Sequence, residues 1–246
     1  MAAILREEFV GNERQLVYLS GGALIDPRII LTTAHHAYKY QNSNTKLIAR
    51  LGEWDSQIQT ELFPHVDVYV KEIIYHDQFN KGNLHNDFAL LVLDQPVELA
   101  PHIDTLCLPS GYDSFDGDYC VATGWGKDKF GAEGNFQNVL KLIELPVVDN
   151  YQCQNQLRQT RLGSKFILDD SLMCAGGEKG KDTCQGDGGS PLACRSKTDP
   201  NRYEVVGLVA FGIGCGENGI PGVYANINRP ETLEWIEYNR NLIYAK

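Results

Sequence analysis

Long apolar runs are missing from this sequence of 246 residues. The longest, such as Phe88–Leu93, are far shorter than the roughly 20 residues that a membrane-spanning helix needs. An excess of basic residues is missing too: the formal net charge is −10, so the chain has no means of displacing counterions from phosphates. We therefore exclude a membrane span and a nucleic-acid partner, whereas a protein partner with a basic surface stays open.

The sequence also has no tandem repeat of short period, no low-complexity linker and no Asn-X-Ser/Thr acceptor for N-linked glycan. With 43% hydrophobic residues, a chain of this length can bury a large core as one or two compact units. Glycine, in contrast, is abundant. Its 24 residues favour a turn-rich β protein over a helical one.

Seven cysteines are present, but no CxxC pair, which argues against a zinc site. Their number in a chain of this length indicates an oxidising compartment and predicts three disulfides plus one odd thiol. The apolar start Met1–Leu5 is too short to be a signal peptide. We therefore interpret the chain as a piece of a longer, secreted extracellular protein.

Short β-branched and apolar runs alternate with Gly, Pro, Asn and Asp turns, a pattern typical of antiparallel sheets closed as barrels or sandwiches. The stretch Leu108–Asp118 is the best boundary between two halves, about 1–107 and 118–229. The segment Pro230–Tyr244 has apolar residues at near-helical spacing and predicts a C-terminal helix. The expected strands are Gln15–Leu19, Ile29–Thr33, Leu47–Leu51, Val66–Ile74, Phe88–Leu93, Cys120–Thr123, Val139–Val147 and Val205–Phe211.

Three features carry chemistry. His35 follows an apolar strand and could be a general base, a metal ligand or a structural residue. Asp87 precedes another apolar run, where a turn-forming role is the alternative. The third is the glycine-dense turn Cys184–Pro191. Taken alone, the histidine and the aspartate favour structural roles; taken in this order, the three are typical of one class of peptidase.

The ordered set resembles the chymotrypsin-like (trypsin-fold) serine peptidases almost from end to end. The resemblance implies two six-stranded antiparallel β-barrels with a cleft between them and a C-terminal helix, so that residues 1–246 form one peptidase-like domain. The matching segments are Ser20–Leu24, Leu31–His35, Gly52–Trp54, Asp87–Leu91, Cys107–Pro109, Cys120–Gly126, Met173–Gly176, Cys184–Leu192 and Pro221–Tyr224.

The nucleophile turn departs from the family pattern Gly-Asp-Ser-Gly-Gly-Pro. Residues 186–191 read Gly-Asp-Gly-Gly-Ser-Pro, which places Gly188 at the nucleophile position beside the matching His35 and Asp87. Loss of such a nucleophile costs about a millionfold in turnover, which predicts an inactive peptidase. The remote alternative is a weak peptidase that uses Ser190, although a two-residue displacement exceeds what a proton relay tolerates. We expect the Ser190 hydroxyl to bond the backbone of the loop.

The loop around the nucleophile position, Gly186, Asp187 and Gly188, corresponds to the oxyanion region of the active family. In active members, an α-amino group made by cleavage pairs with the acid at position 187. No Ile-Val-Gly-Gly-like start precedes the first strand here, so a buried Asp187 needs other hydrogen bonds. We expect a zymogen-like or collapsed loop.

The specificity pocket resembles that of trypsin. Asp182, Gly212 and Gly222 match the base and walls that accept Arg or Lys, with mere residual ancestry as the alternative. However, Ala210 and Phe211 stand where the family usually has Ser and Trp, which puts docking of a substrate strand in doubt.

The resemblance also implies the disulfides Cys120–Cys194, Cys153–Cys174 and Cys184–Cys215 and leaves Cys107 unpaired. The disulfide that normally braces the catalytic histidine loop is missing, since Ser20 and His36 occupy its two positions. In clip-domain relatives, the cysteine at position 107 ties the peptidase-like domain to an upstream clip segment. That segment and the activation segment are absent from this chain.

Closely spaced acidic residues suggest a metal site in the first half. Glu53, Asp55 and Glu61 lie where family members often carry a calcium loop, and carboxylate oxygens suit calcium. The spacing differs from the common loop, so a solvated acidic turn is the alternative. No other cofactor is expected.

Within the family, the motif set resembles the arthropod clip-domain serine peptidase homologues, closest to the prophenoloxidase-activating factor II type, whose nucleophile is likewise glycine. The resemblance implies a non-catalytic cofactor in haemolymph, acting on prophenoloxidase with an active clip-domain peptidase in innate immunity and melanisation. The alternative is a non-catalytic recognition or adhesion protein that binds a microbial surface component or other peptidases.

Overall fold

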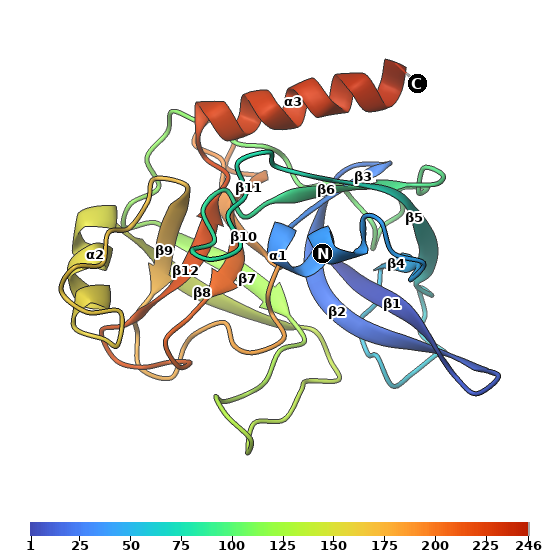
Figure 1. Ribbon diagram of the computed structural model, residues 1–246, viewed down its shortest axis with the longest axis horizontal. Helices are drawn as coiled ribbons and strands as arrows, with labels where there is room; N and C mark the ends of the chain where they lie inside the picture. Colours follow the sequence, from blue (N-terminus) through green and yellow to red (C-terminus); the bar gives the residue numbers. More distant parts are fainter. Residues whose placement is uncertain (246) are drawn as a thin grey trace.

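A computed structural model describes residues 1–245 of the chain. Its strands form two closed antiparallel barrels of six strands each, and the chain ends in a helix (Figure 1). The predicted fold class is therefore confirmed. The first barrel has the strand order β1-β2-β3-β6-β5-β4 and the second has the order β10-β11-β12-β9-β8-β7.

The strands of the first barrel are β1 Ala2–Val10, β2 Glu13–Asp26, β3 Ile29–Thr32, β4 Leu47–Leu51, β5 Val66–Tyr75 and β6 Ala89–Leu93. Those of the second are β7 Tyr119–Gly124, β8 Lys141–Val148, β9 Leu172–Gly176, β10 Pro191–Arg195, β11 Tyr203–Phe211 and β12 Pro221–Asn226. The helices are α1 Ala34–Ala37, the 3-10 turn η1 Tyr38–Tyr40, α2 Asn150–Arg158 and α3 Pro230–Ala245.

Four of these strands, β1, β9, β10 and β12, were not expected as strands from the apolar pattern. Strands β9, β10 and β12 are short and rich in Ala, Gly, Cys and Pro, residues with little intrinsic preference for strands, and β1 carries the charged run Arg6–Glu8. They are strands because each has a partner in register, as β9 does with β12 from Ala225 opposite Leu172 to Pro221 opposite Gly176. Hydrogen bonds to a neighbouring strand therefore stabilise these strands, although their local sequence does not predict them.

The neighbouring strands β3 and β6 join the two barrels. Both are buried at every position, because each face of this pair is covered by protein. Ile30 and Leu91 belong to the core of the first barrel, whereas Ile29 and Leu90 pack with Leu208 of the second barrel. The junction is therefore apolar and rigid, and the segments that follow β3 and precede β6 start from a fixed position.

Helix α3 covers one side of this junction (Figure 1). It begins at Pro230, a favourable first helical residue, and buries Thr232, Ile236, Asn239 and Ile243 along one face. Ile236 and Ile243 join the apolar cluster between the barrels. The predicted C-terminal helix and its docked apolar face are confirmed.

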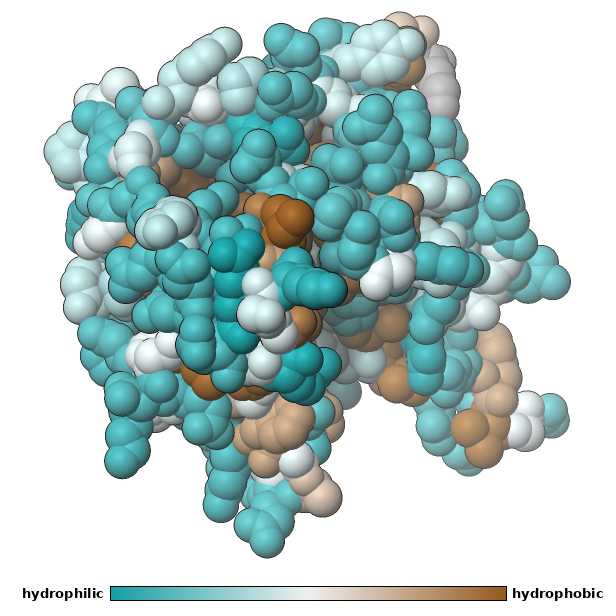
Figure 2. All heavy atoms as spheres, turned by 60° about the vertical axis from the view of Figure 1, so that its left-hand side comes forward, coloured by the Kyte–Doolittle hydropathy of each residue, from teal (hydrophilic) through white to brown (hydrophobic). Residues whose placement is uncertain are grey.

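The face shown in Figure 2 is mostly hydrophilic, with apolar atoms in small separate groups. Among residues 1–245, no helix has the length and apolar character required to cross a membrane.

Candidate functional site

The backbone brings the predicted histidine and aspartate together between the barrels. His35 lies in α1, directly after β3, and Asp87 lies two residues before β6. Strands β3 and β6 are antiparallel neighbours with Thr32 opposite Ala89, so the end of one meets the start of the other. In Figure 1, α1 is drawn between the two barrels.

The two side chains form a well-aligned pair. Asp87 is fully buried, and its Oδ2 lies 2.6 Å from Nδ1 of His35. Its Oδ1 accepts a hydrogen bond of 2.8 Å from the backbone N–H of His35. The carboxylate thus holds the proton on Nδ1 and directs Nε2 away from Asp87, the arrangement that a general base requires.

The turn that should supply a nucleophile presents only backbone to this histidine. Gly186 and Gly189 have φ angles of 101° and 79°, which other residues rarely adopt. The Gly188 carbonyl accepts a hydrogen bond from Gly21 N, and Gly189 N donates to Val209 O, each at 2.8 Å. The turn is tied to both barrels, yet position 188 offers no hydroxyl that His35 could deprotonate.

His36 also lines this cleft, although the sequence pattern pointed to it only as a replaced cysteine. Its ring centroid lies 3.8 Å from that of His35, and its Nδ1 lies 2.8 Å from Thr33 Oγ1. Burial, helped by His35 and Lys39, lowers the pKa of His36 to about 3, so the ring is neutral at physiological pH. Its position next to His35 in the sequence was the only available signal.

Ser190 is fully buried and is not among the residues that line the cleft. Among the described residues, its Oγ makes no hydrogen bond to the backbone of the loop, and it interacts with the side chain of Tyr18. The expectation that this hydroxyl bonds the loop backbone is therefore wrong. A Cβ added to Gly21 would lie 2.2 Å from Ser190 Oγ, so the hydroxyl is packed against β2, where no peptide can reach it.

Asp187 is half-buried and has no cationic partner among residues 1–245. Its Oδ1 accepts from Gly126 N and its Oδ2 accepts from Cys184 N, each at 2.8 Å. Burial raises the pKa of Asp187, and these two amide donors oppose the shift. Two backbone amides thus satisfy the Asp187 carboxylate. A zymogen-like or collapsed loop stays a prediction.

Asp182 lines a cavity of about 200 Å³, together with His35, Gly188, Gly212 and Gly222. Its Oδ2 accepts from Gly216 N at 3.0 Å, whereas its Oδ1 is buried and has no partner among residues 1–245. Burial raises the pKa of Asp182 to about 6. An unpaired buried oxygen on a carboxylate that lines a cavity suits a cationic group.

Three disulfides are present, and they join the pairs that the resemblance implies: Cys120–Cys194, Cys153–Cys174 and Cys184–Cys215. The last of these closes the turn that carries Asp187 and Gly188 against the far wall of the cavity. Cys107 is a half-buried free thiol in this structure.

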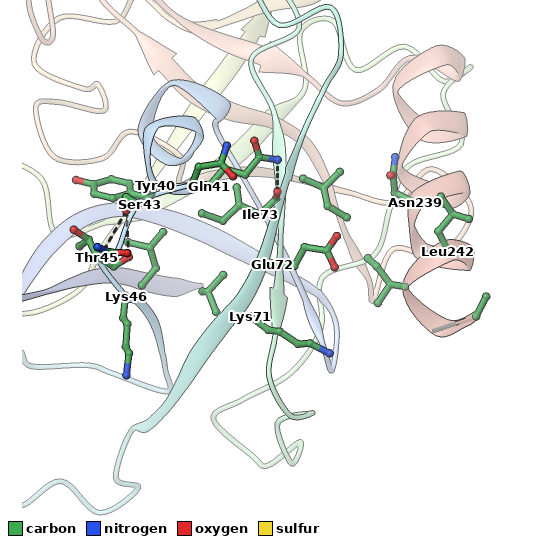
Figure 3. Close-up of a pocket in the computed structure, with 17 residues that line it drawn as sticks. Tyr40, Gln41, Ser43, Thr45, Lys46, Lys71, Glu72, Ile73, Asn239 and Leu242 are labelled. Atoms are coloured by element: carbon green, nitrogen blue, oxygen red, sulfur yellow. Dashed lines mark hydrogen bonds between the residues drawn. The ribbon is translucent and has the colours of Figure 1, made fainter.

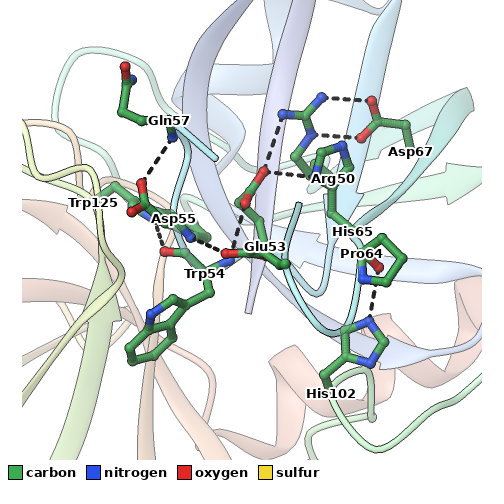
Figure 4. A network of polar contacts seen from close by, with 11 residues as sticks. Arg50, Glu53, Trp54, Asp55, Gln57, Pro64, His65, Asp67, His102 and Trp125 are labelled. Atoms are coloured by element: carbon green, nitrogen blue, oxygen red, sulfur yellow. Dashed lines mark hydrogen bonds and ion pairs between the residues drawn. The ribbon is translucent and has the colours of Figure 1, made fainter. Parts of the chain in front are cut away.

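The acidic residues of the expected calcium loop are engaged in other contacts (Figure 4). Glu53 Oε2 lies 3.3 Å from the Arg50 guanidinium and 3.0 Å from His65 Nδ1. Glu61 accepts from Asp55 N at 2.8 Å. Within the described part of the chain, no group of three or more acidic, histidine or cysteine side chains is placed to hold a metal ion. Calcium binding here stays a prediction.

A second cavity, of about 750 Å³, lies away from this cleft (Figure 3). The loop from Tyr40 to Leu47, part of β5 and the end of α3 form its walls, and Gln41 Nε2 donates to Ile73 O across it. Amide and hydroxyl groups dominate the loop wall, and Lys46 and Lys71 add positive charge. No motif in the sequence indicated this cavity.

The two barrels, the buried Asp87–His35 pair and the glycine turn between them define a protein of the trypsin class. A family model described as Trypsin matches residues 8–236. The chain therefore belongs to the trypsin family.

Within that family, the chain is a homologue of the clip-domain serine proteases. It is 48% identical to phenoloxidase-activating factor 2 of Galleria mellonella, over 96% of this chain and 78% of that protein. It is 43% identical to inactive CLIP domain-containing serine protease A28 of Anopheles gambiae and 47% identical to A3 of Aedes aegypti. These alignments cover 89% and 86% of this chain but 55% and 44% of the mosquito proteins. The chain thus spans about half of each mosquito relative.

Proposed function

We propose that this protein is a non-catalytic member of the trypsin family that acts as a cofactor in prophenoloxidase activation, together with an active clip-domain peptidase. The observation that carries the proposal is the cleft itself. His35 and Asp87 keep the geometry of a general base, while position 188 carries no side chain to activate. Such a cleft retains the shape of a peptidase without its covalent chemistry.

The names of the relatives support both parts of the proposal. Two of the mosquito relatives carry the word inactive, and the Galleria relative is named as a phenoloxidase-activating factor. The Asp182 cavity adds a physical means of recognition, since an arginine or lysine of a partner would supply the cation that its unpaired Oδ1 lacks. Three disulfides fit an extracellular site of action in an arthropod haemolymph.

The test is a reconstitution. Full-length protein containing this chain is added to prophenoloxidase and its activating peptidase, and phenoloxidase activity is measured with and without it. The proposal predicts a rise in activity that requires all three components. Unchanged activity would refute the cofactor role.

The polar loop wall of the 750 Å³ cavity favours a second candidate, a recognition protein for microbial surfaces. Amides and hydroxyls such as those of Gln41, Asn42 and Ser43 can hydrogen-bond sugar hydroxyls. Pull-down by prophenoloxidase compared with pull-down by microbial polysaccharide separates the two functions. Retention by the polysaccharide alone would favour recognition over the cofactor role.

A further inference from the structure

Gly188 differs from the glycines on either side of it. Gly186 and Gly189 have positive φ angles, whereas Gly188 lies outside that region. Its backbone conformation therefore does not require glycine. What excludes a side chain is a neighbour: a Cβ added to Gly188 would lie 2.3 Å from Cε1 and 2.9 Å from Nε2 of His36.

The ring of His36 is held in this place by several contacts. Thr33 Oγ1 lies 2.8 Å from its Nδ1 on one edge. The ring of His35 covers one face at 3.8 Å, and His35 is itself fixed by the buried Asp87. A ring with these contacts cannot turn aside at little cost, so a side chain at position 188 would meet it directly.

Ser20, which occupies the other position of the missing disulfide, does not hold the His36 ring away from Gly188. Ser20 Oγ is buried and has no hydrogen-bond partner among the described residues. Nothing therefore links position 20 to position 36, and the His36 side chain is turned toward Gly188 instead.

We propose that His36 occupies the space in which the side chain of a nucleophile would lie, so that His36 and Gly188 form one coupled lock on the cleft. The proposal rests on the proposed function in one respect, the assignment of position 188 as the nucleophile position. It follows that a serine at position 188 would not restore a peptidase while His36 is present. Two features therefore prevent catalysis in the cleft: the His36 ring occupies the space, and position 188 has no nucleophilic side chain.

A double-mutant cycle tests the coupling. In the full-length protein, Gly188→Ala should lower the melting temperature by about 2–10 °C, because one methyl group overpacks a filled space. In the His36→Ala background, the same substitution should lower it by less than half as much, since the ring is gone. The measurement is thermal unfolding of the four proteins by calorimetry.

Gly222→Ala is the matched control. It lies in the same cleft, and its added Cβ would meet Asp182 Oδ1 at 3.1 Å rather than His36. Its effect should be the same with and without His36. Equal effects of Gly188→Ala in the two backgrounds would overturn the proposal, as would an unchanged melting temperature for Gly188→Ala alone.

A direct measurement covers the case in which Gly188→Ala does not fold. In the unmodified protein, a nuclear Overhauser contact is expected between the Hε1 proton of His36 and the Hα protons of Gly188. Its absence would refute the lock. Neither measurement involves prophenoloxidase. The proposal on His36 and Gly188 can therefore be refuted while the cofactor role holds, and the cofactor role can be refuted while this proposal holds.

Discussion

The two barrels have kept different parts of a peptidase. The first holds the intact pair of His35 and Asp87, and none of the three disulfides lies within it. The second holds all three disulfides, and one of them, Cys184–Cys215, lines the Asp182 cavity beside the turn that carries Gly188. Covalent bracing is thus confined to the barrel that carries Gly188 and Asp182. This contrast supports a role for the second barrel in binding.

The largest loss of stability is expected when a disulfide of the second barrel is removed. Cysteines 120 and 194 close a loop with a sequence separation of 74 residues. Their joint replacement by alanine should lower the free energy of unfolding by about 4 kcal/mol, through the entropy gained by the unfolded chain. Urea denaturation measures this loss.

Cys107→Ala is the control for that double replacement, because Cys107 is free in this structure. It should change the free energy of unfolding by less than about 1 kcal/mol. Equal losses for the two variants would remove the contrast between the barrels, because they would show that bracing of the second barrel adds little.

A smaller loss of stability is expected when Asp87 of the first barrel is replaced. Asp87→Ala leaves the backbone N–H and Nδ1–H of His35 without acceptors at a buried junction, which should cost about 2–4 kcal/mol. Asp87→Asn keeps an oxygen for the backbone N–H and should cost about half as much. Guanidinium denaturation compares the two variants. If both cost nothing measurable, the pair is not a structural element of the first barrel.

The order of landmarks made most of this arrangement predictable. His35, Asp87 and the turn at 184–191 each admit a structural role when taken singly, but together they define the fold and therefore which segments meet. Strand pairing, which fixes β9 and β12, is not visible in their small residues, because the pairing partners are far away in the chain.

The details that escaped prediction depend on side-chain direction. Nothing in the sequence indicates that His36 turns toward Gly188, or that Ser190 turns away from the cleft and against β2. The contacts of Glu53 with Arg50 and His65 likewise depend on the folded backbone. The spacing of residues in the sequence identifies candidate site residues, but side-chain packing determines which of them face the cleft.

The smallest of the three effects concerns the cavity and depends on pH. Burial raises the pKa of Asp182 from 3.8 to about 6, so the folded protein binds this proton more tightly than the unfolded chain does. The free energy of unfolding therefore falls as pH rises from about 4 to about 6 and then levels off. Asp182→Asn removes this loss. It should be more stable than the unmodified protein by about 1–3 kcal/mol above pH 7, and no more stable near pH 4.

A basic ligand should stabilise the unmodified protein relative to Asp182→Asn above pH 7. Benzamidine, a small cation, would pair with the ionised Asp182, so above pH 7 it should raise the melting temperature of the unmodified protein and not that of Asp182→Asn. Below about pH 6 the protonated carboxyl loses this attraction, and the stabilisation should fade. Equal shifts for the two proteins would mean that the cavity does not recognise cations, and the second barrel would then lose its assigned role in binding. A shift confined to the unmodified protein would instead show that the braced barrel retains a working recognition site beside a cleft without a nucleophile.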